Sequence, residues 1–351
     1  MISTLSLIYP VHINSNSRYI LNRLQLCLTN NNGYLNQAEH VVVLSGETKY
    51  VKKATALLGE LNQSNIKIIN TDFSTGPYSP GTARNIGIKT SKGEYLLFWD
   101  IDLIGSPQLF NDIKTQLTKI KANPQHFCMY PCLYLTKQSS QLILKQKKTI
   151  NQDSDLNQSI FSTIFNQVNS AAKNCIEHIA LPTSTLLCQK AHLLKLGNFD
   201  EKFIGHKGED LELIHRLVIN NPIYGIPKDY LTDHASKNPS KQQGFRMLFS
   251  KYSAQNLTNH CYTVHLSHST RLGSKYKNNQ NNNMDYLLTK MQQSLAESKL
   301  SLNDQVINLG GESYFNQPPN IQRTKIEKFS RKIMKLIFQP KLFIRDMFNK
   351  S

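Results

Sequence analysis

Apolar runs alternate with helically spaced apolar positions along the first hundred residues. Short apolar, β-branched runs predict buried strands at 4–11, 40–44, 66–70 and 94–99. Apolar residues at helical spacing predict helices at 17–28, 50–61 and 82–90. Because strands that alternate with helices form βαβ units, we predict an α/β fold built on a parallel sheet. Ligands of such sheets bind beyond the carboxyl ends of the strands, so functional residues are expected in the loops that follow them.

The middle of the chain has a less regular pattern. We predict strands at 127–135 and 141–147, and helices at 156–175 and 211–219. Residues 237–283 are basic and polar. The asparagine-rich run that ends them, 278–283, is expected to be a mobile loop.

Residues 323–351 differ from the rest in charge, with nine Lys or Arg against two acidic residues. Apolar residues recur at helical spacing at Ile326, Phe329, Ile333 and Ile337. A basic amphipathic helix of this kind can lie on an anionic bilayer, with its apolar side chains in the headgroup region. A helix that packs on its own domain has the same pattern, so both interpretations stay open on the pattern alone.

Composition narrows the class of protein. The 351 residues are 39% hydrophobic, which suits a folded chain of one large or two modest domains. No apolar run reaches about 18 residues, so we expect no transmembrane helix. The first ten residues lack the features of a signal peptide, so we do not expect secretion by that route. The six cysteines include no CxxC pair, which argues against a zinc ribbon or a disulfide scaffold and fits free thiols in a reducing cytosol.

The net charge of +17 indicates an anionic partner. Nucleic acid, a membrane surface and a phosphorylated substrate all meet that description. Much of the excess lies in 323–351, and no nucleic-acid-binding motif is present. We therefore expect no nucleic-acid partner.

The strongest chemical signal is a strand that ends in two acids, Asp100 and Asp102. Carboxylates at i and i+2 in a turn can converge on one divalent cation, and their oxygens suit Mn²⁺ or Mg²⁺. Such a cation bridges the phosphates of a nucleotide and neutralises charge on a departing diphosphate. Two solvated turn acids are the plainer alternative, because this pattern is short.

Two helix starts carry further candidate residues. Small residues and Arg84 open the helix just before the acidic strand end, and a helix N-terminus with an arginine suits a diphosphate. An ordinary helix with a solvated arginine fits equally well.

The glycine-rich turn 205–208 precedes Glu209 and Asp210, where an acid can act as a general base. Acids are also favoured in the first turn of any helix.

Two late histidines, His265 and His268, offer imidazoles as additional metal ligands. The chain has 11 histidines, so a histidine near this position has little weight by itself.

The order of these motifs resembles a GT-A glycosyltransferase of the family 2 type over residues 1–270. The matching motifs are, in order, Tyr9-Pro10-Val11, residues 81–87, Asp100 and Asp102, residues 208–212, and a late histidine. The Gly-Glu-Asp segment is similar to that of bacterial chondroitin-type polymerases and β-1,4-galactosyltransferases. The resemblance implies a Rossmann-like, nucleotide-sugar-binding sheet with helices on both faces.

The resemblance also implies roles for the matching residues. Asp100 and Asp102 would bind the metal and the ribose and diphosphate of the donor. Asp210 would be the catalytic base, and its being Asp rather than Asn favours inversion of the anomeric centre. Glu209 would bind a sugar, and a late metal ligand would fall on His265 or His268. Further donor-binding positions are expected at Pro10, Val11, Glu47 and Arg84.

Two departures from the family pattern limit what the resemblance implies. His206 and Lys207 stand where related enzymes usually have Trp and Gly, which leaves the donor and acceptor sugars unassigned. The loop after the second strand has Glu47 instead of the usual acid pair.

Together these features predict a metal-dependent, inverting hexosyl- or N-acetylhexosaminyltransferase. A nucleotide-sugar, with UDP as the first choice, would be the donor, and a bacterial capsule or lipopolysaccharide glycan or glycolipid would be the acceptor. We expect a catalytic domain at 1–270, an Asn-rich loop and helical extension at 271–322, and a membrane-surface anchor at 323–351. The enzyme would be cytoplasmic and peripheral to the inner face of the cell membrane. A retaining transferase and a non-catalytic glycan- or nucleic-acid-binding protein are the alternatives.

Overall fold

A computed structural model describes residues 5–146, 176–268 and 279–309, apart from 16, 18, 62, 74–77, 299, 305, 306 and 308. The helix predicted at 156–175 and the basic segment 323–351 lie outside the described residues. Both therefore stay predictions.

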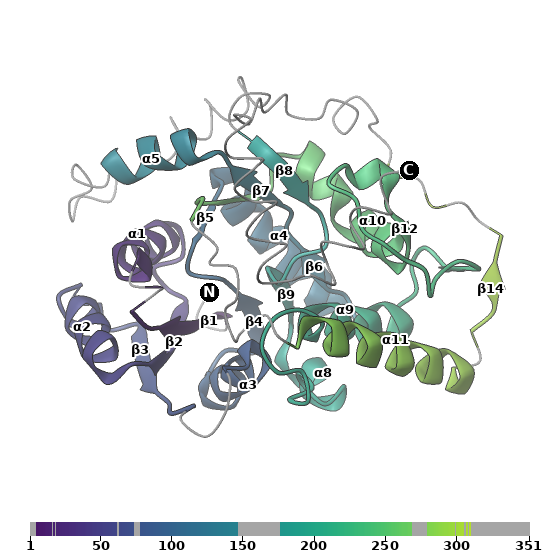
Figure 1. The fold of residues 1–351 in the computed structure, drawn as a ribbon, viewed down its shortest axis with the longest axis horizontal. Helices are drawn as coiled ribbons and strands as arrows, with labels where there is room; N and C mark the ends of the chain where they lie inside the picture. Colours follow the sequence, from purple (N-terminus) through teal and green to yellow (C-terminus); the bar gives the residue numbers. More distant parts are fainter. Residues whose placement is uncertain are drawn as a thin grey trace, which may run out of the picture.

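A six-stranded sheet forms the centre of the molecule, in the order β3-β2-β1-β4-β9-β6 (Figure 1). Its parallel strands are β1 (Leu5–Ile13), β2 (Glu39–Gly46), β3 (Ile66–Asn70) and β4 (Tyr95–Phe98). Two antiparallel strands complete it, β9 (Leu186–Gln189) and β6 (Cys128–Met129). The four predicted strands and the α/β class are confirmed.

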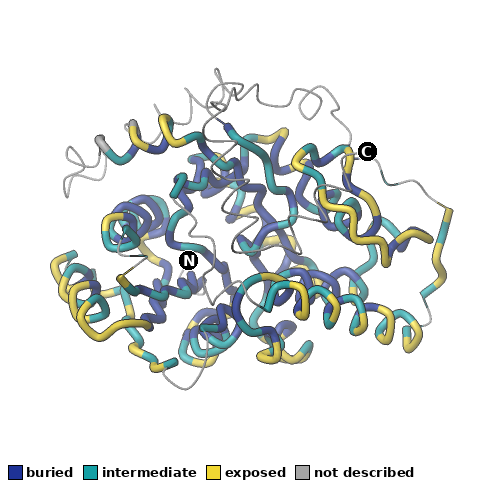
Figure 2. The backbone as a smooth tube through the Cα atoms, viewed as in Figure 1, coloured by how far each residue is buried: buried dark blue, intermediate teal, exposed yellow. Residues whose placement is uncertain are grey.

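Helices cover both faces of this sheet because β1 is apolar on both sides. Leu7 and Tyr9 of β1 pack into one core cluster with α1 (Tyr19–Tyr34), α2 (Thr48–Gly59) and α4 (Pro107–Ala122). Ile8 points to the opposite face, where it shares a cluster with α3 (Pro80–Thr90) and α9 (Glu209–Asn220). Figure 2 shows the buried strands between the exposed outer turns of α2 and of α11 (Gln280–Glu297).

A second sheet, in the order β5-β13-β7-β8, continues from the end of β4. Its strands are β5 (Leu103–Gly105), β13 (Thr263–His265), β7 (Cys132–Leu135) and β8 (Ile176–Ala180). Strand β13 is antiparallel to β5, and His265 pairs with Leu103. This register places a residue from late in the chain beside the acidic turn at 100–102.

Two of the predictions for the middle of the chain are wrong. Residues 137–146 form a helix, α5 (Lys137–Gln146), where a strand was expected at 141–147. The apolar run there is short, and the hydroxyl of Thr136 accepts a hydrogen bond from the Ser139 amide, as a helix N-cap does. The segment predicted as one strand at 127–135 forms β6 and β7, which belong to different sheets.

The asparagine-rich run was expected to be a mobile loop, but its described part opens a helix. Helix α11 begins at Gln280, and Asn283 within it is 5% exposed. Asparagine has a low intrinsic helix propensity, which tertiary contacts can override. These contacts involve the loop that precedes α9.

The remaining described elements lie around this framework. The helices are α8 (Lys190–Lys195), α10 (Phe245–Thr258) and the short 3-10 turn η2 (Pro239–Lys241). The small strand pairs are β10 (Ile226–Pro227) with β14 (Leu302–Asn303), and β11 (Asp233–His234) with β12 (Gln243–Gly244). Among the helices described here, none is long and apolar enough to span a bilayer.

Gly87 gives a test of the packing between α3 and β1. A Cβ added at Gly87 would overlap the side chain of Ile8. We expect Gly87→Ala to lower the free energy of unfolding by about 1–3 kcal/mol, because overpacking a filled core forces side chains and backbone to shift. Urea denaturation measures this change.

Gly59→Ala is the matched control, because no atom lies within 4 Å of a Cβ placed there. This variant should leave stability unchanged or raise it slightly. Equal stabilities for the two variants would contradict the close approach of α3 to β1.

Candidate active site

The site begins where β4 ends, in the turn that carries both predicted acids. The amide of Trp99 donates to the carbonyl of Ile8 at 3.0 Å, and the indole of Trp99 donates to the carbonyl of Leu103 at 3.2 Å. The amide of Leu103 closes the turn by donating to the carbonyl of Asp100 at 3.1 Å. These bonds fix Asp100 and Asp102 at the carboxyl end of the parallel sheet, where ligands of such sheets bind.

Asp102 lies against both late histidines. Its Oδ2 is 3.0 Å from Nε2 of His265 and 3.3 Å from Nε2 of His268. One ligand atom from each of the three residues falls within 4.8 Å of the others, and each side chain is partly exposed. The structure therefore brings together three of the predicted metal ligands, and both late histidines lie in this cluster.

Asp100 is held in a separate set of contacts. Its Oδ1 accepts a bond from Arg84 Nη2 at 3.1 Å, and its Oδ2 accepts a bond from the Ser184 hydroxyl at 2.7 Å. Within the described residues, Asp100 does not join the cluster of Asp102, His265 and His268. The two acids of the strand end thus have different neighbours.

Side chains of α1 support the loop that carries His268. The ring of Tyr19 stacks on His268 with centroids 4.8 Å apart, and its hydroxyl is 3.2 Å from Nδ1 of that histidine. Arg23 donates to the carbonyls of Leu266 and Ser267 at 2.7 and 2.8 Å. Arg23 also lies 3.9 Å from Asp102, so α1 orients both the loop and the carboxylate.

The second sheet supports His265. Its ring stacks on Tyr134 of β7 with centroids 4.4 Å apart, and Tyr134 stacks in turn on His178 of β8 at 4.1 Å. Stacked rings restrict the orientation of an imidazole and so fix the direction of its nitrogens. The second sheet therefore restricts His265, as α1 restricts His268.

The electrostatic environment keeps Asp102 ionised. Burial alone would raise the pKa of this carboxyl. The charge of His265 and the hydrogen bonds from both histidines outweigh burial, so the pKa of Asp102 lies well below its ordinary value. An ionised carboxylate beside two imidazoles is a suitable ligand set for a divalent cation.

Arg84 joins the strand-end acid to the acid pair that opens α9. Its side chain is 3% exposed, and its Nη1 lies 3.1 Å from Oε1 of Glu209 while Nη2 binds Asp100. Ser79 caps α3 by accepting the amide of Thr82 at 3.3 Å, which fixes the helix that carries Arg84. Burial opposes the charge of Arg84, but the nearby carboxylates outweigh it and raise its pKa.

Glu209 is buried, and one of its oxygens has no hydrogen-bond partner among the described residues. That oxygen is Oε2, and Nε of Arg84 is likewise unpaired there. Burial, followed by the charge of Asp210, raises the pKa of Glu209 to about 7 although Arg84 acts in the opposite direction. Glu209 is thus a carboxyl that changes charge near neutral pH.

Asp210 differs from Glu209 because it is partly exposed at the same helix start. Its Oδ1 accepts a bond from the amide of Leu211 at 2.9 Å. Gly208, which directly precedes Glu209, has a φ of +105°. Residues with an L side chain rarely adopt this φ, so glycine is needed to turn the chain into α9. Asp210 therefore combines a fixed backbone with a side chain that solvent reaches.

The predicted donor residues lie at different depths. Val11 is fully buried and Pro10 partly so, which leaves mainly the backbone of this strand end for a ligand. Glu47 is exposed and accepts the amide of Ser15 at 2.8 Å. The sequence placed the nucleoside near residues 10–14 without singling out His12. In the structure the ring of His12 stacks on Tyr78 with centroids 4.6 Å apart.

The raised pKa of Glu209 predicts a pH dependence of stability. Between about 4.5 and about 7 the folded protein keeps a proton on Glu209 that the unfolded chain has lost. The free energy of unfolding should therefore fall as pH rises from about 4.5 to about 7. Glu209→Gln should remove the contribution of Glu209 to this decrease. Chemical denaturation at a series of pH values measures it.

Glu60→Gln, at an exposed position, is the control and should keep the wild-type pH profile. Parallel pH profiles for wild type and Glu209→Gln would contradict the raised pKa.

The solved structures that are similar to this chain include three of S. aureus TarS. The chain matches S. aureus TarS with 18% identity and a TM-score of 0.38, covering 62% of this chain and 34% of that chain. It matches S. aureus TarS 1-349 with 18% identity and a TM-score of 0.37, covering 62% and 56%. It matches S. aureus TarS 1-349 in complex with UDP with 19% identity and a TM-score of 0.36, covering 61% of this chain and 55% of that chain. The chain thus spans between about a third and just over half of these structures. No curated protein matches it.

A comparison with protein families gives a match over most of the chain. Residues 6–293 match the family described as glycosyltransferase like family 2. The matched range includes both acidic motifs, both late histidines and most of α11. The resemblance to a family 2 type glycosyltransferase seen in the motif order is confirmed, together with the enzyme class that it implied. The chain belongs to the glycosyltransferase like family 2.

Proposed function

We propose that this glycosyltransferase moves a sugar from a nucleotide-sugar donor to a hydroxyl group of a glycan acceptor, with help from a divalent metal. The observation that carries the proposal is the cluster of Asp102, His265 and His268 beside the acids joined by Arg84. These groups meet at the carboxyl end of β4. One end of the site can thus hold a diphosphate and the other an acceptor hydroxyl.

The chemistry of the donor set fits a metal. The cluster offers one carboxylate oxygen and two imidazole nitrogens, with Asp102 Oδ2 at 3.0 and 3.3 Å from the two nitrogens. Ligands about 2.0–2.2 Å from a common ion lie about 3 Å from one another. Imidazole suits transition metals, whereas Mg²⁺ prefers oxygen ligands, so this set favours Mn²⁺ over Mg²⁺. When bound, the ion neutralises negative charge on the diphosphate leaving group.

The donor lies along the carboxyl ends of β1, β2 and β4 in this proposal. The backbone at Pro10 and Val11, with Glu47 and the neighbouring His12, borders the nucleoside. Asp100 contacts the ribose and diphosphate, and Arg84 holds Asp100 in place at 3.1 Å. UDP is the first choice of nucleotide because enzymes with similar motifs mostly use UDP donors.

Asp210 acts as the general base. It accepts the proton of the acceptor hydroxyl as the oxygen bonds to the anomeric carbon, while the bond from that carbon to the diphosphate breaks on the opposite face. Attack from the face opposite the leaving group inverts the anomeric centre. Glu209, beside the base, contacts a sugar of the donor or acceptor, as the motif resemblance implies, and Arg84 holds its Oε1 at 3.1 Å.

The acceptor in this proposal is a growing bacterial surface glycan, in capsule or lipopolysaccharide. Residues 323–351 would bring the enzyme to the inner face of the cell membrane through their basic, amphipathic character. Support for this part comes from the sequence alone.

Metal binding tests the cluster directly. Titration with Mn²⁺, followed by electron paramagnetic resonance, should give at least about tenfold weaker binding for Asp102→Asn, His265→Ala and His268→Ala, because each change removes one ligand. Chelation of the metal should stop sugar transfer in the wild type. His234→Ala, at an exposed position in β11, is the matched control and should bind Mn²⁺ as the wild type does. Wild-type affinity in all three cluster variants would disprove the site.

Loss of the base tests the mechanism. Asp210→Asn keeps the size of the side chain and an oxygen for the Leu211 amide, but it cannot accept a proton. We expect kcat to fall about 10²–10⁴-fold with little change in the KM of the donor, as for loss of a general base. Steady-state kinetics with a panel of UDP-sugars measure both constants.

Asp285→Asn, at an exposed position in α11, is the control and should retain wild-type kinetics. Full activity of Asp210→Asn would remove this residue as the base. Nuclear magnetic resonance of the product decides the stereochemistry, since a retained anomeric configuration would favour the retaining alternative.

A further inference from the structure

Helix α11 contacts the segment that carries the acid pair at several points along its length. The segment runs from Phe199 to Asp210, and α11 packs beside α9, which begins with that pair (Figure 1). Three side chains of α11, Asn283, Tyr286 and Lys290, make polar contacts with this segment.

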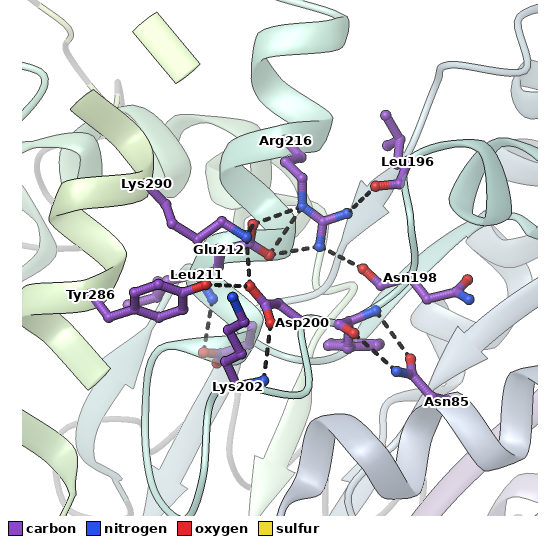
Figure 3. A network of polar contacts seen from close by, with 12 residues as sticks. Asn85, Leu196, Asn198, Asp200, Lys202, Leu211, Glu212, Arg216, Tyr286 and Lys290 are labelled. Carbon is purple, nitrogen blue, oxygen red and sulfur yellow. Dashed lines mark hydrogen bonds and ion pairs between the residues drawn. The ribbon is translucent and has the colours of Figure 1, made fainter. Parts of the chain in front are cut away.

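The first contact is at the start of the segment. Figure 3 shows Tyr286 and Lys290 pointing at Asp200, whose Oδ2 they reach at 3.0 and 2.6 Å. Lys290 also lies 3.0 Å from Oε1 of Glu212, a nearly fully buried residue in the first turn of α9. Lys290 thus links Asp200 to Glu212, on either side of the loop. This link restricts the motion of the backbone between them.

The second contact is in the middle of the segment, where the backbone is least regular. Gly205, Lys207 and Gly208 have φ values of +79°, +72° and +105°. Lys207 is strained at this φ, and such strain persists only where the surroundings impose it. Carbonyls in this irregular backbone cannot be satisfied by a helix or a sheet, so they need other donors.

Asn283 supplies those donors. Its amide nitrogen lies 3.0, 3.1 and 2.9 Å from the carbonyl oxygens of Ile204, His206 and Lys207. The amide has two hydrogens for three acceptors, so at least one bond is shared. A Cβ placed at Gly208 would lie 3.4 Å from the Cβ of Asn283, so the asparagine packs directly against the residue that precedes Glu209.

The segment is also held by Tyr78 and Ser79, the two residues that directly precede α3. The hydroxyl of Ser79 donates to the carbonyl of Phe203 at 3.0 Å, and the amide of Gly205 donates to the carbonyl of Tyr78 at 3.1 Å. The segment therefore lies between α3, which carries Arg84, and α11, which carries Asn283. Removal of either side would leave the acid pair on a backbone with one free face.

We propose that Asn283 is a positioning residue for the acid pair: by fixing the carbonyls of residues 204, 206 and 207, it sets where Asp210 meets the acceptor hydroxyl. The inference rests on the proposed sugar transfer. Catalysis depends on placement, because a displacement of about 1 Å can cost about 10²-fold in rate. The donor and metal ligands lie on other elements, so Asn283 should affect the transfer step and leave donor binding alone.

Two substitutions separate the hydrogen bonds from the packing. Asn283→Ala removes both, whereas Asn283→Asp keeps the shape but replaces the donors with acceptors that face three carbonyls. We expect both to lower kcat for transfer by about tenfold or more, with the KM of the donor and the affinity for Mn²⁺ within about twofold of wild type. Asn282→Ala, an exposed neighbour of the same type, is the matched control and should behave as wild type.

Hydrogen exchange gives a readout that needs no substrate. Amides of residues 203–208 should exchange faster in both Asn283 variants than in Asn282→Ala. Unchanged exchange and unchanged kcat would overturn the proposal. A parallel loss of donor binding, Mn²⁺ binding and thermal stability would overturn it too, because Asn283 would then be a general structural residue.

The two readouts also separate this inference from the proposed function. Faster exchange in the variants, together with no transfer by the wild type from any nucleotide-sugar, would overturn the catalytic role while leaving the contact itself established.

Discussion

The rest of the site depends on the ion pairs that the buried guanidinium of Arg84 makes with two acids. The guanidinium lies 3.1 Å from both Asp100 and Glu209, so one side chain joins the end of β4 to the start of α9. A buried charge is costly unless it is paired, and removal of one partner from such a pair typically costs about 3–5 kcal/mol. Two carboxylates so close together would also repel each other without a cation between them. The pairing of Arg84 with both acids therefore keeps the end of β4 and the start of α9 at a fixed separation.

The second sheet completes what Arg84 begins. Strand β13 pairs with β5, so His265 stands opposite Leu103 and next to Asp102, although these residues are far apart in sequence. Stacked rings from α1 and β7 then restrict His268 and His265. The result is a preformed set of one carboxylate and two imidazoles, whose ligand positions do not have to be assembled at the moment of binding. In the proposed function, preorganisation of this kind would lower the cost of holding a metal and a charged donor.

Helix α11 extends this rigidity to the loop that precedes Glu209 and Asp210. The loop before α9 has three residues in the left-handed region of φ, and it has little regular hydrogen bonding of its own. Asn283 and Lys290 supply the missing contacts from one side, and Ser79 supplies one from the other. The acid pair is thus fixed by elements that surround it, and α11 contacts the loop that carries the pair as well as covering the sheet.

The sequence by itself determined the βαβ alternation, the acidic end of β4, the glycine turn before Glu209 and Asp210, and the order of motifs that marks the family. These features are local, because continuous apolar runs, helical spacing and turn residues each report on a few neighbouring positions. Only the tertiary structure decided that Arg84 lies between two acids, that both late histidines meet Asp102, that 137–146 is a helix, and that Asn283 is buried. The helix at 137–146 follows from a local N-cap at Thr136, which the apolar pattern did not reveal. The other three outcomes depend on contacts between residues far apart in the chain, which local patterns do not encode, and on packing that can override the low helix propensity of asparagine.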